Sequence, residues 1–389
     1  MQIAQKKVLE VVSSKEPGVG VKWVDGSYSF YHYIWLRDNC PCCRHQQTNH
    51  RLIETSTIPL DIEPQETIFS DQELKLFWED GHISSFSFDW LQKYDYTNNN
   101  SYTKDPIVLW SRSNFDNIPT FDYSLISKKN SKSNISKIIE GFYQYGIIFI
   151  KNIPVPHVDV LDIAELFGYI RETNWGKTYH VKSYADANSV AYTNHALFGH
   201  TDDPYRDPIA TAQISLFTKN TTEGGESTLC DGFKIAEDMR VLYPDYFELL
   251  AKTPVHFYLK DNKNIFESIK TIIELDSSGQ INCIRYSNHS SQPFNVHPEK
   301  MYEFYAAYQQ FGRMREHQKY QLKIKMNQGD LYMIDNTRIL HGRSEYSATE
   351  GERNIHGCFL EKDQIISNWK IERLNNDNYW SYWLKVSRY

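Results

Sequence analysis

Apolar and polar residues alternate along several short stretches near the start of the chain. The clearest of these stretches are residues 19–24, 28–33 and 73–78. Alternation with a period of two predicts strands that bury one face. Asp-Gly pairs at 25–26 and 80–81 end two of the stretches and favour tight hairpin turns. We therefore expect a small β-rich domain over residues 1–95.

A polar connection separates this region from the first helical pattern. Polar runs at 98–101 and 128–134 are typical of a linker, which we expect over residues 96–134. The next apolar residues repeat at the spacing of one helix face: Ile135, Ile138, Ile139 and Phe142. A strand is predicted at 147–150, and a further short helix is predicted at 160–167.

Strand-like segments dominate the chain from Ala191 onward, with one clear exception. The exception is an amphipathic helix over residues 301–311. Strands are predicted again at 322–326 and 331–335. Many strands with a few flanking helices favour a β-sandwich or barrel core. We therefore predict a mainly β fold with flanking helices, of the α+β class, for a second domain over residues 135–389.

Composition narrows the classes of protein that fit. The 389 residues are 40% hydrophobic and 14% aromatic, which is typical of a folded chain long enough for two domains. A formal net charge of −7, with no basic patch, argues against a nucleic-acid partner. No apolar run reaches membrane-spanning length, and no signal-like stretch follows the first residues. We expect a soluble cytoplasmic protein with no membrane partner.

Two histidines and one aspartate have the spacing of a metal site. His200 and Asp202 lie two residues apart, so their side chains share one face if this segment is a strand. His341 lies far downstream, beyond the predicted helix and two strands, where a return strand of a barrel would bring it back. Two imidazoles and one carboxylate on one face of a metal form the ligand set of non-haem Fe(II) oxygenases.

Arg353 is a candidate anion-binding residue downstream of His341. Its guanidinium offers a fork of donors that suits a carboxylate. Each lone histidine could instead cap a turn or fill the core, but the set as a whole favours a metal. A second His-x-Asp triplet, at His157 and Asp159, stands at a predicted helix start, where an aspartate favours the helix N-terminus.

Several segments around these residues resemble one known family. The segments are residues 199–208, 224–227, 231–233 and 329–343. They resemble the γ-butyrobetaine and trimethyllysine dioxygenases, which are TauD-like oxygenases that depend on Fe(II) and 2-oxoglutarate. The resemblance extends over nearly the whole chain, and residues 329–343 are its most specific part.

The resemblance implies a double-stranded β-helix, or jelly-roll, core that binds Fe(II) through His200, Asp202 and His341. It also implies that Arg353 binds the co-substrate 2-oxoglutarate, with Ser227 as a second contact. Dioxygen and, as reductant, ascorbate complete the expected reagents. Members of the family tend to form dimers, so a homodimer is expected. The implied reaction is hydroxylation of an unactivated C–H bond in a quaternary-ammonium substrate.

Aromatic residues match the cage in which such family members hold a trimethylammonium group. Cation–π attraction can contribute about 2 kcal/mol to the binding of a desolvated cation. The matching residues are Trp175, Tyr179, Tyr192 and Phe359, and Tyr205 is a further pocket candidate beside the metal triplet. Each of these aromatic side chains could instead belong to the ordinary core.

Polar residues are the candidates for the opposite, anionic end of the substrate. By the resemblance, Ser287 and Asn288 would contact this group, although Ser287 stands where many relatives carry asparagine. Asp203 adds a negative charge beside the metal triplet, which is unfavourable near an anion unless the carboxylate points away or faces the cation. The anionic group could therefore be a carboxylate or a phosphonate.

Three of the six cysteines cluster within residues 35–45, which is typical of a metal site and not of a disulfide scaffold. This segment resembles the zinc-binding start of the same family. The usual Cys-x-Cys-x-x-Cys spacing, counted from the first cysteine, places His45 at the third position. The predicted structural Zn(II) ligands are Cys40, Cys42, His45 and the matching histidine His82, with Cys43 as the alternative ligand.

Three hypotheses for function follow from these observations. The first is an enzyme, a 2-oxoglutarate-dependent dioxygenase that converts γ-butyrobetaine to carnitine. The second keeps this chemistry and changes the substrate to 2-trimethylaminoethylphosphonate or another betaine-like zwitterion. The third is a non-catalytic β-barrel protein that binds a metal or small ligand. The third hypothesis is disfavoured because a non-catalytic protein need not carry the full set of His200, Asp202, His341 and Arg353.

Overall fold

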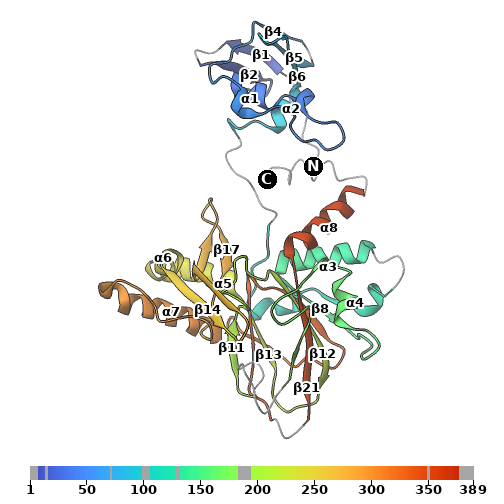
Figure 1. Ribbon diagram of the computed structural model, residues 1–389, viewed down its shortest axis with the longest axis vertical. Helices are drawn as coiled ribbons and strands as arrows, with labels where there is room; N and C mark the ends of the chain where they lie inside the picture. Colours follow the sequence, from blue (N-terminus) through green and yellow to red (C-terminus); the bar gives the residue numbers. More distant parts are fainter. Residues whose placement is uncertain are drawn as a thin grey trace. The chain divides into compact units, whose positions relative to one another are not determined.

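The chain folds into two compact units, one within residues 1–105 and one within residues 106–377. The structure is a computed structural model, shown in Figure 1. It describes residues 8–13, 16–70, 72–98, 106–127, 132–182, 194–347 and 351–375. Among these residues, no helix is long and apolar enough to cross a membrane.

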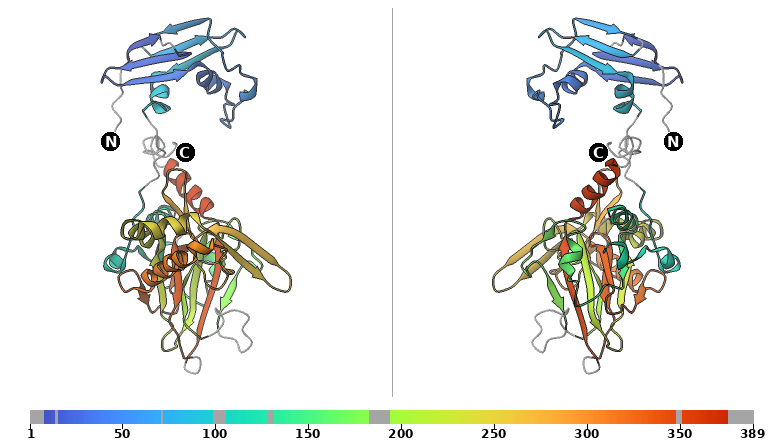
Figure 2. Two further views of the ribbon diagram at one scale, coloured as in Figure 1. Left: turned by 90° about the vertical axis from the view of Figure 1, so that its left-hand side faces the viewer. Right: turned by 90° about the vertical axis from the view of Figure 1, so that its right-hand side faces the viewer.

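The first unit contains two three-stranded antiparallel sheets. One consists of β1 (Val8–Ser13), β2 (Gly18–Trp23) and β3 (Tyr28–His32), and the other of β4 (Glu66–Phe69), β5 (Glu73–Phe77) and β6 (Ile83–Ser87). Figure 2 shows the helices α1 (Tyr33–Asp38) and α2 (Phe88–Lys93) on the same side of the strands. The strands predicted at 19–24, 28–33 and 73–78 are confirmed, although Tyr33 begins α1.

Apolar residues from both sheets form the core of this unit. Val21, Trp23 and Tyr31 from the first sheet pack in one cluster with Leu74 and Leu76 from the second. Burial of such side chains is the main favourable contribution to folding. Gly26 and Gly81 have positive φ at the two predicted hairpin turns, a backbone conformation that glycine adopts without strain.

The second unit is built on two sheets, and the chain passes between them several times. The larger sheet has the order β10 (Tyr179–Val181), β21 (Arg353–Leu360), β12 (Ala212–Asn220), β19 (Leu331–Asp335), β8 (Ile147–Lys151), β7 (Thr120–Asp122), with β9 (Ile170–Arg171) also paired to β21. The smaller sheet has the order β11 (Leu197–His200), β20 (Ile339–Arg343), β13 (Ser227–Asp231), β18 (Leu322–Ile324). From β11 to β21 the chain passes repeatedly from one of these sheets to the other, as in a jelly roll.

Helices gather in two groups beside these sheets (Figure 1). The first group is α3 (Lys132–Tyr145), α4 (Val160–Ala164) and α8 (Lys362–Asn375), which contact one another or the larger sheet. The second group is α5 (Gly232–Leu242), α6 (Pro244–Lys252) and α7 (Met301–Glu316). Two hairpins lie between α6 and α7, namely β14 (Pro254–Lys260) with β15 (Ile265–Thr271) and β16 (Ile273–Leu275) with β17 (Ile281–Ile284).

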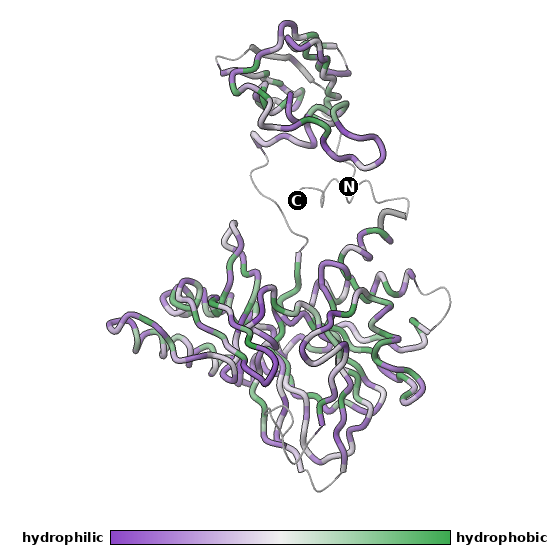
Figure 3. The backbone as a smooth tube through the Cα atoms, in the orientation of Figure 1, coloured by the Kyte–Doolittle hydropathy of each residue, from purple (hydrophilic) through white to green (hydrophobic). Residues whose placement is uncertain are grey.

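The predicted elements around 135–167 and from 301 onward are confirmed, since α3, β8, α4, α7, β18 and β19 all form there. Asp159 caps α4, as expected, because its Oδ1 accepts a hydrogen bond of 3.0 Å from the Leu161 backbone N–H. The expectation of a single helix after Ala191 is wrong, because α5, α6 and α8 also form. Figure 3 shows hydrophobic segments within both units.

Candidate active site

The two histidines and the aspartate predicted as metal ligands lie together in the second unit. Strands β11 and β20 are antiparallel neighbours, and His200 is the register partner of His341. The Nε2 atom of His200 lies 3.2 Å from Asp202 Oδ1, and the Nε2 atom of His341 lies 3.3 Å from Asp202 Oδ2. One ligand atom from each residue lies within 4.8 Å of the other two, which is close enough for one ion to bind all three.

Local contacts hold the His200 ring and the Asp202 backbone in place. The backbone carbonyl of Phe198 lies 2.9 Å from His200 Nδ1, which leaves Nε2 of that ring facing Asp202. The Asn336 side chain makes two hydrogen bonds to the Asp202 backbone. Its Oδ1 accepts from the Asp202 N–H at 2.8 Å, and its Nδ2 donates to the Asp202 carbonyl at 2.9 Å. These contacts set the position of two of the three candidate ligands, His200 and Asp202.

A close approach between two strands brings the histidines together. Gly342 follows His341, and a Cβ at this position would lie 2.2 Å from the backbone oxygen of Leu197 on β11. No side chain larger than hydrogen fits there. The glycine therefore allows β20 to pack against β11 at the distance that the two imidazoles require.

The electrostatics of the three residues suit a cation. Burial alone would raise the pKa of Asp202, but the adjacent His341 and His200 imidazoles outweigh it, and the pKa of this carboxyl lies far below its usual range. Two imidazole nitrogens and one ionised carboxylate are ligands that accept Fe(II) and leave further coordination positions open. The donor set therefore fits a ferrous ion.

A cavity of about 630 Å³ opens beside Asp202 and His341. Arg353 on β21 lines it and is only 7% exposed. Among the described residues no carboxylate lies within ion-pair distance of Arg353, and its Nε donates only a long hydrogen bond of 3.4 Å to the Gly225 carbonyl. A buried cation without a counterion is unfavourable, so this end of the cavity suits an anionic ligand.

A second guanidinium strengthens the positive charge at this end of the cavity. Arg343 on β20 also lines it, and burial together with the charge of Arg353 lowers the pKa of Arg343 to about 10. Tyr332 and Ser215 line the same region. Ser227 lies opposite Arg343 on β13 but is not part of the cavity wall, and its buried Oγ has no hydrogen-bond partner among the described residues.

Most of the predicted substrate residues line the same cavity. These are Trp175, Tyr179, Tyr205, Ser287 and Phe359. The rings of Tyr179 and Phe359 form one pair, with centroids 5.3 Å apart. Asn288 does not line the cavity, because it is exposed and its Oδ1 accepts a hydrogen bond of 2.6 Å from the Tyr308 hydroxyl. Tyr192 lies outside the described residues.

Asp203 lines the cavity, and both of its oxygens are engaged. The Tyr205 hydroxyl donates to Oδ1 at 2.6 Å, and Arg206 Nε donates to Oδ2 at 3.0 Å. The same guanidinium also donates to Asn174, the residue before Trp175. The negative charge of Asp203, which the sequence places near the substrate anion, is therefore balanced by Arg206.

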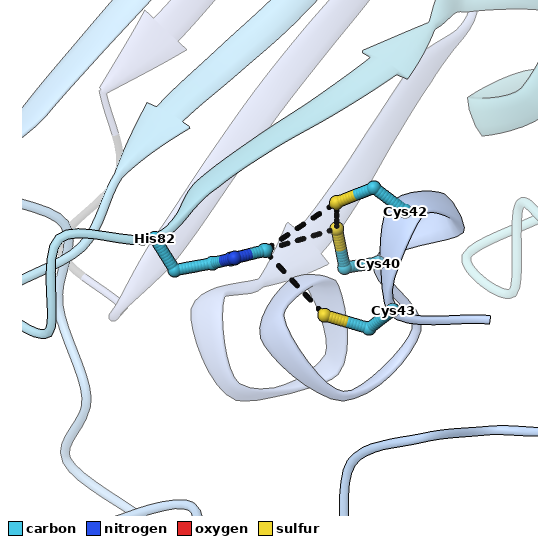
Figure 4. Close-up of side chains that lie close together, drawn as sticks. All are labelled: Cys40, Cys42, Cys43 and His82. Carbon is cyan, nitrogen blue, oxygen red and sulfur yellow. Dashed lines mark hydrogen bonds between the residues drawn. The ribbon is translucent and has the colours of Figure 1, made fainter. Parts of the chain in front are cut away.

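A second group of potential metal ligands lies in the first unit (Figure 4). The His82 Nε2 atom lies 3.4 Å from Cys40 Sγ and 3.5 Å from the Sγ atoms of Cys42 and Cys43. Three thiols and one imidazole within 4.8 Å of one another match a closed tetrahedral zinc site. This donor set fits a structural Zn(II).

The structure does not bring His45 to this group, so the predicted set of Cys40, Cys42, His45 and His82 needs correction. His45 lies beyond the short turn of η1 (Pro41–Cys43), and its Nδ1 is 3.1 Å from the Thr48 hydroxyl. The tight turn of η1 instead lets the adjacent Cys42 and Cys43 both face His82. The alternative ligand, Cys43, takes the place that spacing had assigned to His45.

Comparison with known families covers both units. Residues 111–359 match the family described as taurine catabolism dioxygenase TauD, TfdA family. The chain belongs to this family. Residues 11–92 match a second description, gamma-butyrobetaine hydroxylase-like, N-terminal. The predicted resemblance to the γ-butyrobetaine and trimethyllysine dioxygenases within the TauD-like class is confirmed.

Individual relatives align along most of the chain. The gamma-butyrobetaine dioxygenase of Pseudomonas sp. (strain AK-1) is 31% identical over 92% of this chain and 94% of its own length. The mitochondrial trimethyllysine dioxygenase of Bos taurus is 28% identical over 88% of this chain and 82% of its own length. A solved structure of AAD-2 in complex with Mn(II) and N-oxalylglycine is similar in fold, with a TM-score of 0.50, 12% identity and coverage of 60% of this chain and 90% of that one.

Membership of the TauD, TfdA family agrees with the site. The predicted mainly β fold with a jelly-roll core is confirmed, and the protein is a dioxygenase that depends on Fe(II) and 2-oxoglutarate. Sequence reasoning missed several polar residues that build or line this site. They are Gln213, Ser215, Tyr332, Arg343 and Asn336. The available signal for Gln213 and Ser215 was their alternation with Ile214 and Leu216 in an otherwise buried strand.

Proposed function

We propose that this dioxygenase hydroxylates an unactivated C–H bond in a trimethylammonium zwitterion, and that the reaction is the conversion of γ-butyrobetaine to carnitine. The proposal rests on one cavity whose wall has three chemically different parts. Its wall includes Asp202 and His341 of the candidate metal group, the buried Arg353, and an aromatic surface with Trp175 and Tyr179. Similarity to a gamma-butyrobetaine dioxygenase over 92% of the chain supports the choice of substrate.

In this proposal His200, Asp202 and His341 hold the ferrous ion. Bound Fe(II) supplies activation of dioxygen, coupled to oxidative decarboxylation of 2-oxoglutarate. The Arg353 guanidinium binds the distal carboxylate of 2-oxoglutarate with a planar fork of N–H donors, which suits a carboxylate geometrically. Arg343 adds a second positive charge nearby. Ser227 stays a candidate for a further contact to the co-substrate.

The aromatic wall is the proposed site for the substrate cation. Trp175, Tyr179 and Phe359 offer π faces to a trimethylammonium group, which cannot donate a hydrogen bond and therefore binds by cation–π and dispersion attraction. Tyr205 is held by Asp203 at the same wall. Tyr192 remains a candidate on sequence grounds alone.

The opposite end of the substrate carries its negative charge, and Ser287 is the proposed contact. The Ser287 side chain lines the cavity, whereas the Asn288 amide oxygen is already bonded to Tyr308. We therefore prefer Ser287 to Asn288 for this role. A hydroxyl donor there serves a carboxylate and a phosphonate equally well, so substrate assays must separate the two.

The first unit is the proposed zinc domain, with Cys40, Cys42, Cys43 and His82 as ligands. The boundaries 1–95, 96–134 and 135–389 remain a proposal. The gap between the two family matches, which end at residue 92 and begin at residue 111, supports a division near residue 95 and does not bear on the boundary at 134. A homodimer, a role for ascorbate as reductant and a cytoplasmic location also remain proposals. Sedimentation of the purified protein tests the dimer.

Product analysis tests the proposed reaction. Purified protein with Fe(II), 2-oxoglutarate and ascorbate should form succinate and a product one oxygen heavier when γ-butyrobetaine is present. A parallel assay with 2-trimethylaminoethylphosphonate and other betaine-like compounds identifies the anionic group. A higher kcat/KM for the phosphonate would make that compound, and not γ-butyrobetaine, the substrate. No substrate-stimulated succinate from any quaternary amine would reject this substrate class.

A further inference from the structure

A buried amide stands between the metal ligands and the aromatic wall. Gln213 lies near the start of β12, a strand paired on both sides by β19 and β21, and its side chain lines the cavity. The residue is 4% exposed, and its neighbours Ala212 and Ile214 are fully buried. An amide taken out of water is unfavourable unless it is hydrogen-bonded. The contacts of Gln213 therefore need an explanation.

Both protons of the amide nitrogen have a partner. Gln213 Nε2 donates to Asp202 Oδ2 at 2.9 Å and to the Tyr179 hydroxyl oxygen at 2.6 Å. Asp202 is a proposed iron ligand, and Tyr179 belongs to the proposed cation-binding wall. One side chain thus links the two parts of the site.

The bond to Asp202 restricts the carboxylate. Its Oδ1 faces His200 and its Oδ2 faces His341, and the amide donor reaches only Oδ2. A carboxylate turns about its last single bond, and a donor fixed on one oxygen limits that rotation. Hydrogen bonds to ligating carboxylates orient the ligands of metal sites in general, and their loss typically weakens metal binding about 10- to 100-fold.

The bond to Tyr179 restricts the aromatic ring. The hydroxyl oxygen accepts from Gln213, while the ring lies against Gly357 of β21, where a Cβ would come within 2.4 Å of Tyr179 Cζ. The ring also contacts Phe359, with centroids 5.3 Å apart. The ring is thus held at its hydroxyl by the amide and packs closely against Gly357 and Phe359.

We propose that Gln213 is a positioning residue that orients Asp202 for the metal and Tyr179 for the substrate cation through the two protons of one amide. The part that concerns the substrate rests on the proposed function, whereas the part that concerns the metal does not. Removal of the amide therefore weakens metal binding and substrate binding together. Removal of the Tyr179 hydroxyl affects the substrate side alone.

Metal titration of the metal-free protein tests the first half. Mn(II), followed by electron paramagnetic resonance, is the probe, because it favours oxygen and nitrogen ligands over the thiolates of the other cluster. Gln213→Leu should weaken Mn(II) binding by about 10- to 100-fold. Tyr179→Phe, the matched variant, should leave the Mn(II) affinity within about twofold of the wild-type value, because the Asp202 contact remains.

Steady-state kinetics with γ-butyrobetaine test the second half. Both Gln213→Leu and Tyr179→Phe should raise its KM, and in the double variant the second change should add little, because the two residues act through one hydrogen bond. Mn(II) affinity that is unchanged in Gln213→Leu, or reduced equally in Tyr179→Phe, overturns the metal half of the proposal. A KM for γ-butyrobetaine that Gln213→Leu leaves unchanged overturns the substrate half.

A second variant covers the case in which Gln213→Leu fails to fold. Gln213→Asn keeps an amide but is one methylene shorter, so its nitrogen falls short of Asp202 as well as of Tyr179, and it should show the same loss of Mn(II) affinity. If no quaternary amine is hydroxylated by the wild-type protein, the proposed function fails, and the Mn(II) titration still decides whether Gln213 positions Asp202.

Discussion

Arg353 illustrates how a single side chain defines one end of the active site. Its guanidinium is buried beside Arg343, and among the described residues it has no acidic partner. A buried positive charge of this kind costs stability, which an anionic ligand recovers on binding. The residue is therefore expected to act on the affinity for 2-oxoglutarate and to leave the metal ligands unchanged.

Arg353→Met should raise the KM for 2-oxoglutarate by about 10- to 100-fold, since a charge-assisted hydrogen bond contributes ~1.5–3 kcal/mol. Arg353→Lys should lie between this variant and the wild type, because lysine keeps the charge and loses the planar fork. Initial rates at varied 2-oxoglutarate measure the effect, and Mn(II) affinity is the control. An unchanged KM in Arg353→Met would remove this residue from the co-substrate site.

Among single residues, the sequence indicated which three candidate ligands lie together, but not the residues that hold them in place. The candidate ligands can be recognised in a single sequence, because His200 and Asp202 have a characteristic spacing and His341 follows far downstream. Gln213 and Asn336 carry no such pattern, because each acts through a contact that the fold creates, with Asn336 lying 134 residues from Asp202. The structure places Cys43, and not His45, beside His82. Residue counting did not anticipate this, because the turn of η1 directs two adjacent thiols to one side.

At the level of elements, one buried ion pair joins five segments of the catalytic unit. Arg338, just before β20, donates to both oxygens of Asp231 at the end of β13, at 3.0 and 2.7 Å. It also donates to the carbonyls of Gln144 on α3 and Val108. Asp231 in turn caps α5 by accepting from the Phe233 N–H. The pair therefore ties the metal-bearing strand to its neighbours.

Arg338→Met should reduce the free energy of unfolding of the catalytic unit by about 3–5 kcal/mol, because it leaves Asp231 buried without its cation. The two side chains are only 2% and 0% exposed. Lys252→Met is the matched control, since the Lys252–Glu248 pair is 78% and 51% exposed and should contribute less than about 1 kcal/mol. Chemical denaturation followed by tryptophan fluorescence measures both. Equal stability of the two variants would contradict this account of the pair.

Helices α5 and α6 show what the sequence pattern leaves hidden at this scale. Asp231 caps α5, and Pro244 occupies the first turn of α6, which are ordinary helix-start signals. The surrounding segments nevertheless read as strands, because short apolar runs are ambiguous between a buried strand and a buried helix. The longer α3 and α7 were predictable, since their apolar spacing persists over several turns.

At the scale of the whole molecule, the two units hold two groups of potential metal ligands with different chemistry. The first unit offers three thiols and one imidazole, and the second offers two imidazoles and one carboxylate. Soft thiolates select zinc, whereas mixed nitrogen and oxygen ligands suit iron. The protein should therefore carry both metals at once, and loss of one should not remove the other.

Cys43→Ser should lose Zn(II), because it removes one of the four ligands that face one another in the first unit. His45→Ala should retain a full equivalent, since that ring is bonded to Thr48 and lies outside the cluster. Elemental analysis of the purified variants measures the metal content. Loss of zinc from His45→Ala together with retention in Cys43→Ser would restore the ligand set that residue spacing had suggested.

We propose that His200, Asp202 and His341 hold one ferrous ion beside a 2-oxoglutarate bound by Arg353. Anaerobic addition of Fe(II) and 2-oxoglutarate to the metal-free protein tests it directly, because chelation of a ferrous ion by a 2-oxo acid produces a visible charge-transfer absorption. The wild-type protein should show this band. His341→Ala and His200→Ala should lose it while their Zn(II) content stays unchanged. A band of full intensity in either histidine variant would contradict the assignment of these residues as iron ligands.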